Sequence, residues 1–298
     1  MDSGCHEEDY RRVVEPAAAA ARTIPGTSIE IIREPARKRA PRHVLFDFDG
    51  TLSLIREGWP EVMIPLMVET LLATGTSESP EKLRELCKDF VTELTGKQTI
   101  YQMIRLAEEV AKRGGAADDP MAYKQQYLDR LAERIADRRE GLLSGRLAPE
   151  DMLVPHSLDL LDALREKGAA LYLASGTDEP FVVEEAAMLG LDRYFGDQVH
   201  GARDDYRSFS KAQVIERILS ENRVDGESLL GFGDGYVEIM NVKAVGGTAV
   251  AVASDEAGRS GRPDPWKRDR LIGAGADVVV PDYRDCRALV KYLWNGTE

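Results

Sequence analysis

Two acidic residues follow directly on an apolar stretch near residue 45. The segment HVLFDFDGTL places Asp47 and Asp49 behind a continuous apolar run, and Gly50 and Thr51 come next. Residues two apart on an extended strand share a face, so the two carboxylates can converge on one site where the strand breaks. Neighbouring carboxylates repel one another, and a hard cation with oxygen ligands relieves that repulsion. Taken alone, the pattern also fits acidic residues of an ordinary turn or helix cap.

Two further clusters carry groups that suit a phosphate. Ser175, Gly176 and Thr177 follow the apolar run AALYLA, where hydroxyls and free backbone N–H groups at a strand-to-helix turn would cradle an anion. A simple N-cap explains the same residues. Lys211 begins the helical pattern KAQVIERIL, an unfavourable place for a cation unless an anion lies nearby. A solvated surface lysine is the alternative interpretation.

A glycine-rich turn carries the last cluster. The segment GFGDG, residues 231–235, follows the apolar run SLL, and Glu238 comes four residues after Asp234. Glycines permit tight backbone turns, and Asp234 at a strand end can complete a magnesium site with Asp47 and the carbonyl of Asp49. Glycine-rich loops with an acidic residue are common, so this cluster by itself specifies little.

The rest of the chain must position these clusters. From about residue 56 to 150, apolar residues recur at intervals of three and four, which predicts helices with no intervening strand. Residues 151–298 then alternate between strand and helix patterns, which is typical of a parallel sheet covered on both faces. The α/β core is therefore expected to comprise residues 27–55, with a short edge strand at 28–32, and 151–298. In such a sheet, ligands bind at the carboxyl ends of the strands.

Composition excludes several classes of function. The formal net charge of −13 would repel a nucleic acid backbone. The sequence contains no run of about 18 apolar residues, so it gives no indication of a membrane span. Cys5, Cys87 and Cys286 are scattered and odd in number, which favours free thiols in a reducing compartment. We therefore expect a cytoplasmic protein that binds neither nucleic acid nor membrane, while the oligomeric state stays open. Residues 1–26 lack apolar periodicity and are expected to form a disordered tail.

All four clusters, in this order and each expected at a strand end, resemble the signature of the haloacid dehalogenase superfamily. That signature is DxDGT, then a strand-terminal Ser or Thr, then Lys, then a GD motif with a following acid. The resemblance covers about residues 43–54 and 151–282. It implies a Rossmann-like core, and the helical block at 56–150 resembles the α-helical cap domain that phosphatases of the phosphoglycolate phosphatase type insert between the first and second motifs.

The resemblance implies a role for each motif residue. Asp47 would be the nucleophile on phosphorus, and Asp49 the general acid for the leaving alcohol and then the general base for water. Ser175, Gly176 and Lys211 would bind the phosphoryl oxygens. The expected reaction is hydrolysis of a small organic phosphate monoester, such as a sugar phosphate or a phosphoglycolate-like compound, through an aspartyl-phosphate.

The same resemblance implies Mg²⁺ as cofactor. Asp47, Asp49 and Asp234 would be its protein ligands, with Glu238 and Thr51 supporting them from outside the coordination shell. Glu238 stands where many members carry Asp, so direct ligation by this longer side chain is left open. Phosphoryl transfer depends mainly on positioning and on neutralising charge, which a divalent cation and a lysine supply.

Substrate contacts are expected in the helical block. Arg56 and Trp59 follow the first motif, and Lys97 and Gln98 lie at a break between helices. These side chains suit a polar, hydroxylated or carboxylated leaving group. Trp59 in the core and Lys97 in solvent are the alternatives.

Other reactions remain open on the same core. A phosphonate hydrolase would use a cap lysine as a Schiff base, a role for which Lys97 is a candidate, and a phosphomutase would have identical core motifs. Asp49 argues against a dehalogenase, which lacks that aspartate. A non-enzymatic phosphate-binding module is opposed by the completeness of the motifs.

Overall fold

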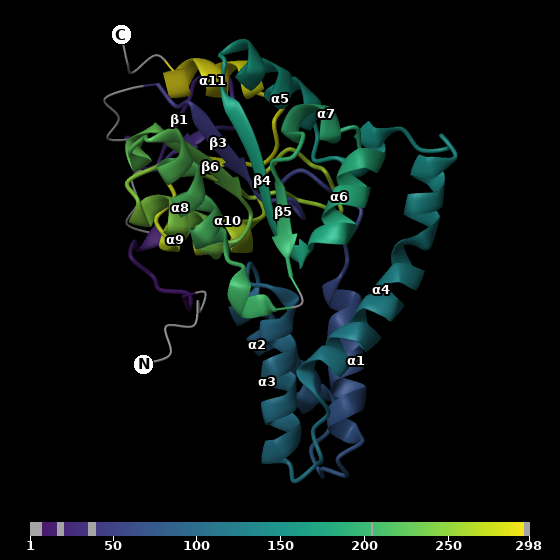
Figure 1. Ribbon diagram of the computed structural model, residues 1–298. Helices are drawn as coiled ribbons and strands as arrows, with labels where there is room; N and C mark the ends of the chain where they lie inside the picture. The colour runs from purple at the N-terminus through teal and green to yellow at the C-terminus, as the bar shows by residue number, and fades with distance from the viewer. Residues whose placement is uncertain (1–7, 17–20, 35–39, 204, 295–298) are drawn as a thin grey trace.

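A mostly parallel β-sheet forms the centre of the molecule. The computed structural model describes residues 8–16, 21–34, 40–203 and 205–294. Helices cover both faces of the sheet, and a separate helical lobe projects from one end of it (Figure 1). The strand order is β1-β2-β8-β7-β6-β3-β4-β5. This arrangement is the α/β fold with an inserted helical domain that the sequence predicts.

The strands are short, and all but the first two run parallel to their neighbours. β2 pairs antiparallel with β8, and β1 pairs antiparallel with β2, so these two extend one edge of the sheet. The bounds are β1 Arg22–Thr23, β2 Glu30–Ile31, β3 His43–Phe46, β4 Ala170–Asp178, β5 Val199–Ala202, β6 Leu229–Gly233, β7 Thr248–Val252 and β8 Val278–Val280.

The core is divided by the sheet into two layers. Val44 and Phe46 of β3 belong to one apolar cluster, whereas Leu45 belongs to the other, because successive strand residues point to opposite faces. The first face is covered by α5 (Ser157–Glu166), α6 (Glu179–Met188), α7 (Asp192–Phe195) and α11 (Cys286–Trp294), and the second by α8 (Lys211–Asn222), α9 (Tyr236–Ala244) and α10 (Pro265–Gly273). Burial on both faces explains why the central strands read as continuous apolar runs.

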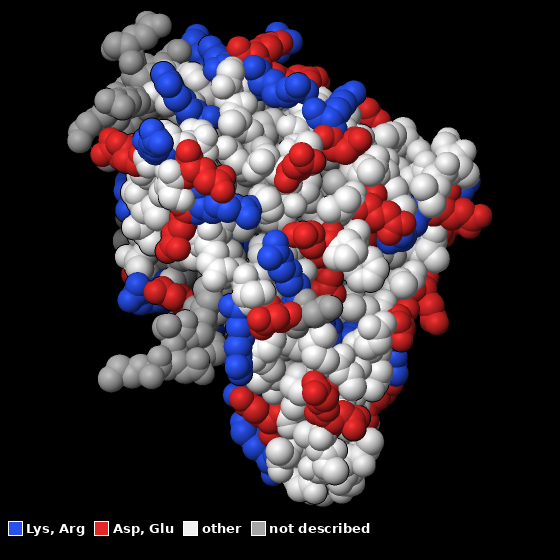
Figure 2. Space-filling view, in the orientation of Figure 1, with Lys and Arg blue, Asp and Glu red and all other residues white. Residues whose placement is uncertain are grey.

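Four helices form the projecting lobe, which we call the cap. They are α1 (Pro60–Leu72), α2 (Pro80–Leu94), α3 (Thr99–Lys112) and α4 (Pro120–Leu143), all inside the range 56–150 predicted for it. Their apolar stripes face one another and bury residues such as Leu66, Leu106 and Leu131. None of the described helices is long and apolar enough to span a bilayer. Acidic and basic side chains are interspersed over both the sheet domain and the cap on the face shown in Figure 2.

The two segments that join cap and core are held together. Arg138 of α4 donates from Nη1 to the carbonyl oxygens of Ile55 and Glu57, each at 2.8 Å, and from Nη2 to the Glu57 carboxylate at 2.7 Å. Ser53, on the incoming side, pairs with Leu153 on the returning side in an isolated bridge. Because these contacts connect the two segments that join cap and core, the cap is fixed at its base.

Part of the N-terminal segment packs on the core, contrary to the expected disordered tail at 1–26. The Val13 N–H donates to the carbonyl of Gly273 at 2.8 Å, and the Tyr10 ring lies edge-on against Tyr236 at 5.5 Å. Isolated apolar residues such as these give no periodic signal, so the sequence pattern missed them. Residues 1–7 and 17–20, including Cys5, lie outside the described part. Cys87 and Cys286 are buried free thiols.

Candidate active site

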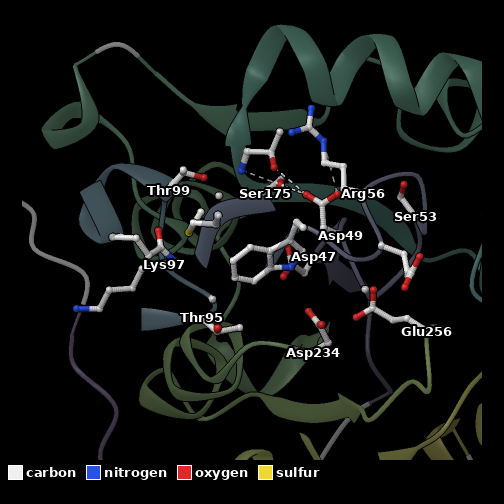
Figure 3. Close-up of a pocket in the computed structure, with 18 of the residues that line it drawn as sticks. Asp47, Asp49, Ser53, Arg56, Thr95, Lys97, Thr99, Ser175, Asp234 and Glu256 are labelled. Atoms are coloured by element: carbon white, nitrogen blue, oxygen red, sulfur yellow. Dashed lines mark hydrogen bonds and ion pairs between the residues drawn. The ribbon is translucent and has the colours of Figure 1, made fainter. Parts of the chain in front are cut away.

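A small pocket lies where the carboxyl ends of the strands meet the cap. Its cavity is about 100 Å³, and it is lined by motif residues of the core and by side chains of the cap. Figure 3 shows Asp47, Asp49 and Asp234 lying around one space, with Glu256 beside them. The structure therefore gathers the acidic residues of the first and last motifs, as strand-end positions predict.

Asp47 is buried and paired with a lysine. Its Oδ1 lies 2.9 Å from Lys211 Nζ and accepts a 2.7 Å hydrogen bond from the Phe48 N–H. Burial raises the pKa of Asp47 to about 6, although the Lys211 charge opposes that rise. Lys211 begins α8, as predicted, and only 1% of its side chain is exposed. A buried carboxylate with one close ammonium is a candidate nucleophile whose charge is held in place.

Glu238 also contacts Lys211. The structure places its carboxylate against Lys211 Nζ, and its side chain is buried. The predicted role of Glu238 outside the coordination shell of a metal stays a prediction, and its observed partner is Lys211, which also contacts Asp47. The extra methylene of Glu gives the carboxylate its reach toward the lysine. Glu238 is thus a second carboxylate, besides Asp47, beside the Lys211 ammonium group.

Asp49 is held by hydroxyl groups and lies near an arginine. Thr177 Oγ1 donates to Asp49 Oδ2 at 2.8 Å, Ser175 Oγ lies 3.5 Å from the same oxygen, and Arg56 Nε lies 3.9 Å from Oδ1. Figure 3 shows Asp49, Ser175 and Arg56 together on one side of the pocket. Burial raises the pKa of Asp49 to about 6, against the lowering effect of Arg56. A carboxyl group with such a pKa can exchange a proton near neutral pH.

The second cluster differs from the predicted strand-to-helix turn. β4 continues through Ser175 and Gly176 as far as Asp178, with an irregular register near its end, and α6 begins only at Glu179. Gly176 lies against the cap, because a Cβ there would stand 3.1 Å from the carbonyl oxygen of Lys97. Ser175 and Gly176 nevertheless both line the pocket. The strand continues because the irregular end still pairs with β5.

Asp234 is positioned by the first motif. Its backbone N–H donates to Thr51 Oγ1 at 3.0 Å, and Thr51 is completely buried. Gly50 has φ of +71°, and a Cβ there would lie 2.2 Å from Asp234 Oδ2, so only glycine fits this turn. Thr51 therefore connects the first motif to the last, and its role around a metal stays a prediction.

Lys267, Glu256 and Ser254 were not predicted for the site. Lys267 Nζ lies 2.8 Å from Asp234 Oδ2, 2.5 Å from Glu256 Oε1 and 3.2 Å from Ser254 Oγ, and Ser254 donates to the Gly50 carbonyl at 2.7 Å. Glu256 and Ser254 follow the end of β7, so the strand-end rule could have found them. Lys267 lies in the first turn of α10 and is indistinguishable in sequence from a surface lysine.

The donor chemistry of the pocket suits Mg²⁺. Carboxylates of Asp47 and Asp234 face the same cavity, and the charge of Asp234 contributes to the raised pKa of Asp47 after burial and Lys211. Oxygen donors with mutually unfavourable charge are what a hard divalent cation binds. Among the described residues, however, no three His, Cys, Asp or Glu side chains form a ready-made cluster. The predicted set, in which Asp49 contributes a main-chain carbonyl, needs only two side chains.

The predicted substrate residues in the cap have different surroundings. Arg56 lines the pocket, but its guanidinium makes two hydrogen bonds, of 3.0 and 2.8 Å, to the fully buried Glu185 of α6. Trp59 lines the pocket at the start of α1. Arg56 is thus a link between the base of the cap and the core that also reaches Asp49.

Lys97 lines the cavity with its amine directed away from it, and Gln98 does not line it. Lys97 Nζ lies 2.6 Å from Asp9 Oδ1, and Figure 3 shows the amine directed away from Asp47 and Asp49. The Gln98 amide donates to the carbonyl oxygens of Tyr206 and Phe209 at 3.2 and 2.9 Å, and Gln98 is not among the residues that line the cavity. The hypothesis that Gln98 contacts substrate is therefore not supported. Its amide fastens the cap to the core loop before Lys211.

Other cap side chains face the cavity instead. Thr95 and Thr99 flank the break between α2 and α3, Gln102 lies one turn into α3, and Tyr127 comes from α4. Their sequence signals are those of ordinary helix residues. Only the packing of the helices decides that these side chains point toward the core.

The comparisons with known proteins agree with this arrangement. The model of the haloacid dehalogenase-like hydrolase family matches residues 41–246. A search among curated proteins finds no significant relative. Solved structures share the fold at low identity, so they inform on architecture alone.

Three of these structures illustrate the likeness. A predicted phosphoglycolate phosphatase from Haemophilus somnus is 15% identical, with 84% of this chain and 97% of that chain covered and a TM-score of 0.54. A β-phosphoglucomutase from Clostridium difficile is 11% identical, with 85% and 97% covered and a TM-score of 0.55. A haloacid dehalogenase-like protein from Agrobacterium tumefaciens is 17% identical, with 84% and 97% covered and a TM-score of 0.52. On the family match, this chain belongs to the haloacid dehalogenase-like hydrolases.

Proposed function

We propose that this hydrolase is a magnesium-dependent phosphatase of small organic phosphate monoesters. The observation that supports it most is the buried Asp47 carboxylate, which lies 2.9 Å from Lys211 Nζ at a cavity that also contains Asp49. A carboxylate nucleophile beside a second, proton-exchanging carboxyl group suits a displacement in two steps. The partner would be a phosphorylated small molecule.

In the first step an Asp47 oxygen attacks phosphorus. A bond forms between that oxygen and phosphorus while the bond to the leaving oxygen breaks, and Asp49 gives its proton to the leaving alkoxide. With a pKa of about 6, Asp47 is mostly ionised at neutral pH, as the attack requires. Lys211 holds the nucleophile and attracts the phosphoryl oxygens.

In the second step water replaces the aspartyl group. Asp49, now ionised, accepts a proton from the water as its oxygen attacks phosphorus, and the bond to Asp47 breaks to release inorganic phosphate. The pKa of about 6 lets Asp49 alternate between acid and base near neutral pH. The hydroxyls of Thr177 and Ser175 orient its carboxylate for both transfers.

Mg²⁺ would be held by Asp47, the main-chain carbonyl of Asp49 and Asp234, and when bound it would neutralise charge on the phosphoryl group. Other residues position Asp234 and set the charge around it. Thr51 fixes the Asp234 backbone, and Lys267 and Glu256 set the charge around its side chain. The donor chemistry described above supports this assignment.

Contact between cap and core would keep bulk water out of the first step. A Cβ on Gly235 would stand 2.9 Å from the Cα of Gly96 in the cap, and Gly176 meets the Lys97 backbone in the same way. Backbones can approach so closely only at glycines. Opening and closing along this glycine contact would admit substrate and release product.

Phosphate release tests the proposal. The wild type should release inorganic phosphate from p-nitrophenyl phosphate and from a panel of organic phosphates only when Mg²⁺ is present, and Asp47→Asn should reduce the rate at least 10³-fold. A metal-independent rate, or a variant as active as the wild type, would contradict it. The matched control is Asp129→Asn, an exposed aspartate on α4.

The same assay separates the alternatives. A phosphomutase would convert one phosphorylated isomer to another with little net phosphate release. A phosphonate hydrolase would need a free lysine amine in the cavity, whereas Lys97 Nζ is paired with Asp9 and directed away from it. Trapping by borohydride on a phosphonate substrate would restore that alternative.

A further inference from the structure

We infer that the leaving group is a short, uncharged chain with a hydroxyl group, recognised by the amide of Gln102. A glycerol phosphate or a small polyol phosphate has this chemistry, whereas phosphoglycolate does not. The inference rests on the proposed function and narrows its substrate class.

The first argument is the charge of the cavity. Three cationic side chains line the cavity, and each already lies within 3 Å of a carboxylate of the protein. The pairs are Arg56 with Glu185, Lys97 with Asp9, and Lys211 with Asp47. A carboxylate on the leaving group would thus meet no available cation. It would instead enter a cavity that five carboxylates line, at a cost in desolvation and repulsion.

A cationic leaving group is disfavoured for the complementary reason. Each of the five carboxylates already has a cation within 4 Å, which offsets part of its charge, so an ammonium group would gain less from them than from anions without such partners. The pairs are Asp47 with Lys211, Asp49 with Arg56, Glu57 with Arg138, and Asp234 and Glu256 with Lys267. An uncharged leaving group is the class that this arrangement admits.

The second argument is an unsatisfied acceptor. Gln102 is 3% exposed and lines the cavity. Its Nε2 donates to the carbonyl oxygen of Leu94 at 3.3 Å, which fixes the orientation of the amide, and its Oε1 has no hydrogen-bond partner among the described residues. A buried acceptor without a donor is costly. A substrate hydroxyl supplies that donor, whereas an ionised carboxylate has no proton to give.

The neighbouring cap residues suit the same ligand. Thr95 donates its hydroxyl proton to the Val91 carbonyl at 2.9 Å, so its oxygen keeps lone pairs that accept from a hydroxyl. Trp59 and Met63 add apolar surface for carbon atoms. The cavity of about 100 Å³ is well below the roughly 300–1,000 Å³ of sites for drug-sized ligands. Short chains are therefore favoured over nucleotides or long sugars.

Binding to the Asp47→Asn protein tests the inference without turnover. Calorimetric titration with Mg²⁺ present would compare glycerol 1-phosphate, n-propyl phosphate, 2-phosphoglycolate and phosphoethanolamine. Glycerol 1-phosphate should bind about tenfold more tightly than propyl phosphate, a size-matched ester without the hydroxyls, which is the upper range for one neutral hydrogen bond. Phosphoglycolate and phosphoethanolamine should bind more weakly than both.

A second substitution assigns the preference to Gln102. In Asp47→Asn/Gln102→Leu, the ratio of the two affinities should fall to about one, while propyl phosphate binds as before. Gln125→Leu, an exposed glutamine of α4, is the matched control and should keep the tenfold ratio. The unchanged affinity for propyl phosphate also shows that the double variant is folded.

Each outcome is decisive. Tighter binding of phosphoglycolate or phosphoethanolamine, or a preference for glycerol 1-phosphate that survives Gln102→Leu, would overturn the inference. Magnesium-dependent turnover of p-nitrophenyl phosphate alongside such a result would leave the proposed function intact. A glycerol phosphate preference that depends on Gln102, without turnover of any ester by the wild type, would support the inferred ligand and refute the phosphatase.

Discussion

The two halves of the pocket are built from different chemistry. The half formed by the core holds charged groups in tight pairs, such as Asp47 with Lys211 and Asp234 with Lys267. The half formed by the cap presents hydroxyls, an amide and apolar surface, and its one lysine, Lys97, points outward to Asp9. Charge is thus concentrated where phosphorus would react and is neutralised elsewhere.

This difference indicates that the core half controls phosphoryl transfer and that the cap half controls selection of the leaving group. Phosphoryl transfer needs fixed charges, and a change in the core half should alter every substrate alike. Selection of the leaving group needs shape and uncharged hydrogen bonds, and a change in the cap half should alter one substrate relative to another. The following substitutions test that division.

The largest effect is expected for Lys211→Met in the core half. Loss of the ammonium should raise the pKa of Asp47 further above 6 and leave Glu238 buried without its cation. The kcat/KM for all esters should fall about 10³-fold at pH 7. Part of the loss should be recovered at pH 8.5, because a higher pH ionises more of Asp47.

Steady-state rates at both pH values check this prediction. Lys88→Met, an exposed lysine of α2, is the control. A loss confined to one ester would contradict a role in the chemistry common to all substrates.

Arg56→Gln lies at the boundary of the two halves. The Arg56 charge lowers the pKa of Asp49, so its removal should raise that pKa above about 6. Asp49 acts first as an acid, and its protonated form would then persist to higher pH. The alkaline limb of the profile of kcat against pH should move upward by about one unit, a factor of ten in proton affinity.

Removal of Arg56 also leaves Arg139 as the remaining cation beside the buried Glu185. This should lower the free energy of unfolding by about 3 kcal/mol. Arg56→Gln/Glu185→Gln should recover stability, and because the Glu185 charge raises the pKa of Asp49, its removal should also reverse part of the shift. Arg130→Gln, which breaks an exposed ion pair on the cap, is the control. An unshifted limb in the folded Arg56→Gln variant would contradict the coupling to Asp49.

Lys267→Met should increase the affinity for Mg²⁺, whereas loss of a metal ligand would decrease it. Its ammonium neutralises Asp234 and Glu256, so without it the carboxylates should attract Mg²⁺ about tenfold more strongly. Titration calorimetry with Mg²⁺ alone measures this, and Lys88→Met serves again as control. Weaker binding would show that Lys267 instead holds Asp234 in the orientation that the metal needs.

The smallest effect is expected for Asp9→Asn. It removes the ion partner of Lys97, but 85% of the Asp9 side chain is exposed, and solvent-screened pairs contribute little. KM should change less than about twofold for any ester. A larger, substrate-specific change would show that the released Lys97 amine reaches the cavity.

Much of the fold and of the core half could be predicted from the sequence. Apolar runs broken by polar residues located β3 and β6, and strand ends meet at one edge of a parallel sheet, so Asp47, Asp49 and Asp234 had to lie together. The family signature added the roles. These features are local in sequence or follow from sheet topology, which is why a pattern suffices.

Only the tertiary structure decided the partners of these residues. Lys267 reaches Asp234 from α10, Glu238 turns to Lys211, and Gln102 faces the cavity while Gln98 does not. Each outcome depends on the angle at which one helix packs on another element, and a rotation of a few tens of degrees would exchange the side chains that point inward. No local pattern encodes that angle, because it results from how the apolar faces of cap and core fit together.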